Sequence, residues 1–91
     1  MNNMVMLIGR ISEIGDSFIH IKNVDLENKE QTFLIRVNEN IIKNIKEYCK
    51  NGDLIGIKGR LVDISGTTYV DADKVSFLAS TKKEDPNKNE I

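Results

Sequence analysis

The sequence predicts an all-β protein, a small closed barrel of five strands with a single α-helix between the third and fourth strands. Apolar and polar residues alternate over five separate stretches, which is typical of strands that bury one face. Helical spacing occurs in only one stretch, between residues 38 and 52. One helix cannot supply a crossover for each parallel strand pair, so an antiparallel barrel with one end covered by the helix fits this order. An open sheet with one helix packed across it is the structural alternative.

The first predicted strand spans residues 4–14. It begins as a continuous apolar run and then alternates around Gly9, where the missing side chain tolerates a bulge or a sharp bend. The dipeptide Gly15-Asp16 that follows is typical of a turn.

The second and third predicted strands, residues 17–24 and 31–37, alternate most regularly, and the charged residues 25–30 connect them. In both strands one face is apolar and consists of Ile19, Ile21, Phe33, Ile35 and Val37. The opposite face mixes aromatic, basic and polar side chains: Phe18, His20, Lys22, Thr32, Leu34 and Arg36. Because period-two alternation assigns one face to the core, we expect the mixed face to be exposed.

The predicted helix carries one apolar stripe, formed by Ile41, Ile42, Ile45, Tyr48 and Cys49. Asn38 or Asn40 is the expected N-cap, and Gly52 is the expected stop signal. We therefore expect the stripe, Tyr48 and Cys49 included, to pack on the core.

The fourth and fifth predicted strands, residues 53–64 and 67–79, are separated by the turn dipeptide Ser65-Gly66. In the fourth strand the inward positions are Ile55, Ile57, Gly59 and Leu61, and the outward positions include Lys58 and Arg60. From residue 80 the composition becomes polar and contains the only proline. We predict one domain over residues 1–80 and a disordered polar tail over residues 81–91.

Composition limits the function classes. The chain has 91 residues, enough for one domain, and its net charge is −1, so a nucleic-acid ligand requires the positive charge to be concentrated on one face. The single Cys49 and single His20 offer no metal site, and we expect no cofactor. No nucleophile, phosphate-loop or dinucleotide motif occurs, which predicts a protein that is not an enzyme. The absence of a leader or a long apolar run predicts a soluble, cytoplasmic protein.

Three segments carry a resemblance to a known family. Residues 7–11, LIGRI, resemble the first-strand signature of the bacterial single-stranded DNA-binding proteins. Residues 45–61, IKEYCKNGDLIGIKGRL, are similar to the helix end and fourth strand of that family, and residues 75–80, VSFLAS, to the close of its fifth strand. The resemblance covers residues 4–80 in the same order.

This resemblance implies an OB-fold barrel that binds single-stranded DNA without sequence specificity. It also implies a homotetramer or homodimer acting in replication, recombination, repair or mobile-element transfer. The chain departs from the family in its aromatics: it has no Trp, and Thr32 and Asn38 stand where stacking aromatics are common. Its hairpin connections are short and the acidic C-terminal tail of the family is absent.

The predicted nucleic-acid site centres on the second and third strands, where OB folds bind their ligands. Binding of a single strand needs flat groups for the bases and cations for the phosphates. We predict that Phe18 and His20 stack on bases and that Lys22 and Arg36 pair with phosphates. Neighbouring strands are expected to extend this surface, so the full predicted site is Arg10, Phe18, His20, Lys22, Leu34, Arg36, Lys58, Arg60 and Tyr69.

Alternatives remain open for these residues and for the function. Phe18 equally suits a cap on the barrel rim, and His20 suits an ordinary exposed strand position. Met4, Met6 and Ile8 offer a surface for a symmetric dimer. The alternative function is an OB barrel used for protein–protein contact, as an accessory subunit of a replication, primosome-like or conjugation complex, with weak or no DNA binding.

Overall fold

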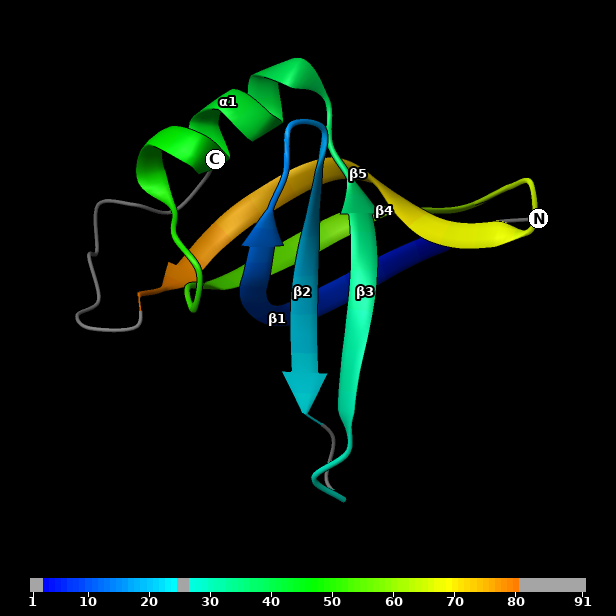
Figure 1. Ribbon diagram of the computed structural model, residues 1–91, viewed down its shortest axis with the longest axis horizontal. Coiled ribbons are helices and arrows are strands. Elements are labelled where there is room, and N and C mark those ends of the chain that lie inside the picture. Colours follow the sequence, from blue (N-terminus) through cyan, green and yellow to red (C-terminus); the bar gives the residue numbers. More distant parts are fainter. Residues whose placement is uncertain (1–2, 25–26, 81–91) are drawn as a thin grey trace.

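The computed structural model describes residues 3–24 and 27–80. It consists of β1 (Met4–Ile14), β2 (Phe18–Val24), β3 (Glu30–Arg36), α1 (Glu39–Tyr48), β4 (Leu54–Ile64) and β5 (Thr67–Ala79) (Figure 1). Every strand begins and ends within one residue of its predicted bounds, and the helix lies between β3 and β4 as predicted. The predicted tail, residues 81–91, and part of the connection over residues 25–30 lie outside the described residues.

The five strands form a closed barrel in the order β1-β2-β3-β5-β4. Strand β1 belongs to both halves of the barrel because it changes partner at Arg10: residues 4–10 pair with β4 and residues 10–14 pair with β2. All neighbours are antiparallel except β3 and β5, which close the ring through two parallel pairs, Ile35 with Val70 and Arg36 with Asp71. The closed antiparallel architecture is confirmed.

Irregular registers mark the points where the long strands bend. In β4 the irregularity lies at the mid-strand Gly59, where an added Cβ would lie 2.3 Å from the Asp71 carbonyl oxygen. A side chain at this position would therefore force β4 and β5 apart. In β1 the irregularity lies between Ile11 and Glu13 rather than at Gly9, so the bend predicted at that glycine occurs a few residues later.

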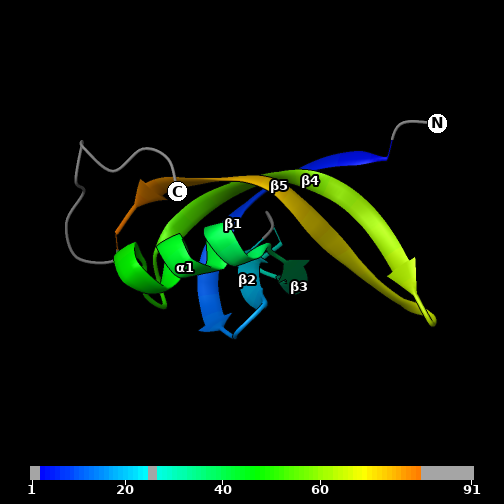
Figure 2. The same cartoon turned by 90° about the horizontal axis from the view of Figure 1, so that it is seen from above.

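The core fills the barrel with aliphatic side chains, and α1 covers one end of it (Figures 1 and 2). Ile19, Ile21 and Ile35 are fully buried, which confirms the predicted alternation of β2 and β3. The N-cap is Asn38, whose side chain accepts a hydrogen bond of 2.8 Å from the Ile41 backbone N–H. The inward face of the helix is formed by Ile41, Ile42 and Ile45.

Two predicted core residues lie elsewhere. Tyr48 is 51% exposed because α1 ends there, and its last turn lies at the outer margin of the barrel end (Figure 2). Leu61 is 44% exposed because it lies just beyond the last β1–β4 pair, Met4 with Arg60. Asn3, which precedes β1, hydrogen-bonds to the backbone of Leu61 and leaves its side chain uncovered. Cys49 is half-buried and packs against the core as expected.

Candidate nucleic-acid interface

A groove of about 530 Å³ lies on the outer face of β2 and β3, and the β4–β5 hairpin forms its side wall. We call it the β2–β3 groove. Five of the nine predicted site residues meet here: Phe18, His20, Leu34, Arg36 and Tyr69. The remaining lining residues are Ser17, Ile64 and Thr67. The fold thus gathers three flat rings, a guanidinium and aliphatic side chains around one concave surface.

The two rings of β2 lie side by side along the groove. The ring centroids of Phe18 and His20 are 5.3 Å apart at an interplanar angle of 56°. Phe18 is half-buried because it packs on the β1–β2 turn, where an added Cβ on Gly15 would lie 2.3 Å from the ring. Gly15 therefore supplies the space that this ring occupies. The imidazole of His20 also lies 3.6 Å from a carboxylate oxygen of Glu13.

Arg36 lies beside Phe18, because the two residues are direct partners in the β2–β3 ladder. Its guanidinium donates a hydrogen bond of 3.2 Å to the Tyr69 hydroxyl and lies 3.5 Å from the Asp71 carboxylate. The guanidinium carbon is also 5.3 Å from the Tyr69 ring centroid. Tyr69 is only 9% exposed, so Arg36 forms most of the accessible surface at this point.

Lys22 and Arg10 extend the same face beyond the groove. They are direct partners in the β1–β2 ladder, and such partners point to the same side of a sheet. Lys22 forms an ion pair of 3.0 Å with Glu30, and Arg10 donates a hydrogen bond of 2.9 Å to the Gly52 carbonyl. Both side chains are exposed, so a row of two cations follows the row of rings.

Lys58 and Arg60 do not line the groove. Arg60 nevertheless lies only one strand from Arg36, since both arginines are ladder partners of Asp71. Lys58 and Arg60 belong to β4, which has β1 and β5 as neighbours and does not touch β2 or β3 in the ladder. Lys58 lines a second pocket, and Arg60 lies 3.9 Å from the Asp73 carboxylate. Alternation correctly gave their outward orientation, but it carries no information on which side of a closed barrel an outward residue lies.

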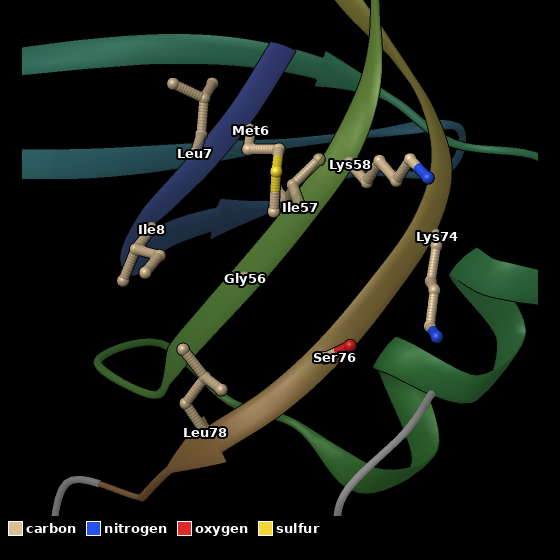
Figure 3. Close-up of a pocket in the computed structure, with 9 residues that line it drawn as sticks. All are labelled: Met6, Leu7, Ile8, Gly56, Ile57, Lys58, Lys74, Ser76 and Leu78. Carbon is tan, nitrogen blue, oxygen red and sulfur yellow. The ribbon is translucent and has the colours of Figure 1, made fainter. Parts of the chain in front are cut away.

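The second pocket, of about 400 Å³, lies on the outer face of β1, β4 and β5, which we call the β1–β4–β5 face (Figure 3). Met6 and Ile8 are 78% and 56% exposed, and their direct partners in β4 are Lys58 and Gly56. In Figure 3 Lys58 and Lys74 lie together at one end and Leu78 at the other. The two lysines are direct partners between β4 and β5. This face is therefore aliphatic with a basic margin, and it offers no exposed ring.

Sequence reasoning missed Ser17, Ile64 and Thr67 in the groove. Ile64 and Thr67 flank the Ser65-Gly66 turn, so an aliphatic residue directly before a turn was the available signal. Within residues 3–24 and 27–80 no group of three or more His, Cys, Asp or Glu side chains could hold a metal ion. In the same part of the chain no helix is long and apolar enough to cross a membrane.

Comparisons with known proteins agree on the fold. Neither a protein-family model nor a curated protein matches the sequence. Among solved structures, the mitochondrial single-stranded DNA-binding protein Rim1 of S. cerevisiae is similar, with a TM-score of 0.78 and 21% identity over 91% of this chain and 100% of that one. The dimeric N-terminal domain of PriB from Thermoanaerobacter tencongensis gives a TM-score of 0.75 and 15% identity over 88% of this chain and 100% of that one. These similarities establish the OB fold.

Proposed function

We propose that this protein binds single-stranded DNA without sequence specificity, with the strand lying across β2 and β3. The observation that carries the proposal is the β2–β3 groove, where Phe18, His20 and Arg36 surround one concave surface. Every base has a flat face, so stacking on such groups tolerates any sequence. The groove also lies on the face that OB folds use for oligonucleotides.

Different parts of the surface suit the bases and the phosphates of a nucleotide. The groove is lined largely by aromatic and aliphatic side chains, which suits bases rather than phosphates. The exposed cations Lys22 and Arg10 follow along the same face, where a backbone leaving the groove would pass. Ile64, from the β4–β5 hairpin, closes the groove on one side. We infer that bases enter the groove and that the phosphates face Lys22 and Arg10.

The comparisons support this reading, because Rim1 is a single-stranded DNA-binding protein with the same fold over its whole length. The proposal describes a binding protein rather than an enzyme. Replication, recombination, repair and mobile-element transfer are the processes in which such binding would serve.

The test is a titration by fluorescence anisotropy with labelled oligo-dT of graded length. We expect binding that weakens steeply with salt, because each phosphate contact releases condensed counterions. A duplex of the same length should bind much more weakly, since its bases are not free to enter the groove. No binding to the single strand at low salt, or equal binding to the duplex, would contradict the proposal.

A second copy of the chain is the partner we propose for the exposed part of β1. Met4, Met6 and Ile8 are about half to three-quarters exposed, and residues 4–9 pair with β4 along one edge while the β2 ladder begins only at Arg10. Exposed apolar side chains on this part of β1 offer a surface for contact between copies. The PriB domain of the same fold is dimeric. A mass measurement in solution should give a dimer or tetramer, and a monomer at micromolar concentration would contradict this.

Protein–protein contact is the second candidate function, and the ion pairs favour it. Lys22 pairs with Glu30, Arg36 with Asp71 and Arg60 with Asp73, so carboxylates of the protein itself compete with phosphates for these cations. A face neutralised in this way suits a protein partner of a replication or transfer complex. Replacing Lys22 and Arg36 with Glu separates the two candidates: unchanged retention of DNA would favour the second.

A further inference from the structure

Two contacts within the protein engage the guanidinium of Arg36, one with Asp71 and one with Tyr69. Asp71 is its direct partner across the β3–β5 closure, and the carboxylate lies 3.5 Å from the guanidinium. An N–H of the guanidinium donates a hydrogen bond of 3.2 Å to the Tyr69 hydroxyl. The Asp71 carboxylate offsets the charge of Arg36, so a phosphate at this guanidinium would have to compete with it.

The same contacts leave the flat face of Arg36 available. The side chain is 52% exposed, whereas the Tyr69 ring beneath it is buried. The guanidinium carbon lies 5.3 Å from that ring, so one side of Arg36 rests on Tyr69 and the other side is open to the groove. Arginine planes stack on nucleobases in proteins that recognise single strands.

The neighbours of Arg36 in the groove are flat groups as well. Phe18 is its direct partner across the β2–β3 ladder, and the His20 ring lies 5.3 Å from the Phe18 ring. A guanidinium plane thus continues a row of two rings, and Arg36 is the one Lys or Arg among the described residues that line the groove.

We propose that Arg36 is a base-stacking residue rather than a phosphate contact, with Asp71 and Tyr69 as the positioning residues that hold its plane. This inference rests on the proposed DNA binding and specifies the chemistry of one of its residues. Both cations are ion-paired, Lys22 with Glu30 at 3.0 Å and Arg36 with Asp71 at 3.5 Å. What separates them is shape: the ammonium of Lys22 has no flat face, so stacking is open to Arg36 alone of the two.

The experiment compares Arg36→Lys, Arg36→Gln and Lys22→Gln with the wild-type protein, using oligo-dT titrated at several salt concentrations. Stacking by an exposed cation contributes about two- to fivefold in affinity. We expect both Arg36 variants to lose affinity by this factor, with the slope of log affinity against log salt unchanged. Lys22→Gln should instead make the salt dependence shallower, reducing the magnitude of the slope by about 0.7, the value for one phosphate contact on a single strand.

An abasic oligonucleotide of the same length provides the second readout, because it keeps the phosphates and lacks the bases. Arg36→Lys and the wild type should bind it equally. A further variant, Asp71→Asn, frees Arg36 from its carboxylate. It should make the salt dependence steeper, increasing the magnitude of the slope by about 0.7 on either oligonucleotide. A circular dichroism melt of each variant checks that the barrel is intact.

Two results would overturn the inference while leaving the proposed function intact. Arg36→Lys could bind oligo-dT as well as the wild type does, or Arg36→Gln could make the salt dependence shallower as Lys22→Gln does. Either result would make Arg36 a phosphate contact. A wild-type protein that fails to bind oligo-dT at low salt would instead contradict the proposed function itself.

Discussion

The β2–β3 groove and the β1–β4–β5 face are both concave surfaces on the outside of one barrel, yet they differ in chemistry. The groove presents the flat groups of Phe18, His20 and Arg36, of which the imidazole and the guanidinium have polar edges. The β1–β4–β5 face presents Met6, Ile8 and other flexible aliphatic groups. Flat groups stack on bases of any sequence, whereas flexible aliphatic groups fit the irregular surface of a protein. The barrel therefore offers one side to DNA and the other to a second copy of itself under the proposed function.

Charge reversal in and beside the groove should give the largest effect, a loss of DNA affinity with the oligomeric state unchanged. The double variant Lys22→Glu and Arg36→Glu removes a phosphate contact and a stacking plane and adds two repulsive charges. We expect the affinity for oligo-dT at 0.1 M salt to fall on the order of 100-fold. Anisotropy measures the loss, and sedimentation should give an unchanged oligomer, because neither residue lies on the β1–β4–β5 face. A changed oligomer would mean that the two sides are not independent.

Removing one ring from the groove should have the next largest effect. Phe18→Ala takes away a stacking surface, and such losses amount to about 1–3 kcal/mol of binding free energy. Tyr48→Ala is the matched control, because Tyr48 is an exposed aromatic on α1 and does not line the groove. Isothermal titration with oligo-dT should show a loss for Phe18→Ala alone. Equal affinities of the two variants would mean that Phe18 only caps the barrel rim.

A charge on the opposite side should weaken self-association without affecting DNA binding at each site. Met6→Glu places a carboxylate on a residue that is 78% exposed in the monomer, so the fold should tolerate it. Burying this charge between two copies would cost several kcal/mol, so we expect the dimer dissociation constant to rise at least about tenfold. Analytical ultracentrifugation over a dilution series measures this, with Tyr48→Glu as the control. If Met6→Glu dimerises like the wild type, the contact lies elsewhere.

The smallest effect concerns the turn that supports Phe18. The Lys46 ammonium donates a hydrogen bond of 2.8 Å to the Asp16 carboxylate, and this bond, with the attraction between the charges, lowers the pKa of Asp16 below its ordinary value of 3.8. A carboxyl group with a lowered pKa stabilises the fold above its unfolded pKa, and this stability is lost as the pH falls through the folded pKa. Asp16→Asn should lower the Tm by roughly 2 °C at pH 7, since the pair is exposed. Thermal melts should show the difference shrinking as the pH falls below 3.8 and through the lowered pKa of Asp16. A difference that persists there would assign it to another cause.

Most of the fold was predictable because local patterns specify it. Alternation placed Ile19, Ile21 and Ile35 in the core, and the Asn38 signal marked the start of the helix. The predicted burial of Leu61 and Tyr48 was wrong, because the pattern shows which face of an element a residue occupies and not how far the neighbouring elements extend. Leu61 is exposed because β1 begins opposite Arg60, and Tyr48 is exposed because α1 ends there.

The site was predictable in part. Phe18, His20, Leu34 and Arg36 come from two strands paired along their whole length, so one register brings them together. Lys58 and Arg60 do not line the groove, because β4 pairs with β1 and β5 and not with β2 or β3. The partnership of Arg36 with Asp71 depends on the β3–β5 register, which joins segments far apart in the sequence and leaves no local signal. The expected cytoplasmic location stays a prediction.

The short closure between β3 and β5 has a consequence for motion. Only two residue pairs join these strands, whereas β4 and β5 pair along nearly their whole length. Local opening requires the least free energy where the fewest contacts must break, so amide hydrogens at this seam should exchange fastest among the paired strands. The β2–β3 groove spans the same seam, with Arg36 on one side and Tyr69 on the other. A ligand bound in the groove disfavours opening of the β3–β5 pairing. Slower amide exchange at residues 35–36 and 70–71 would therefore detect binding without a label on the ligand.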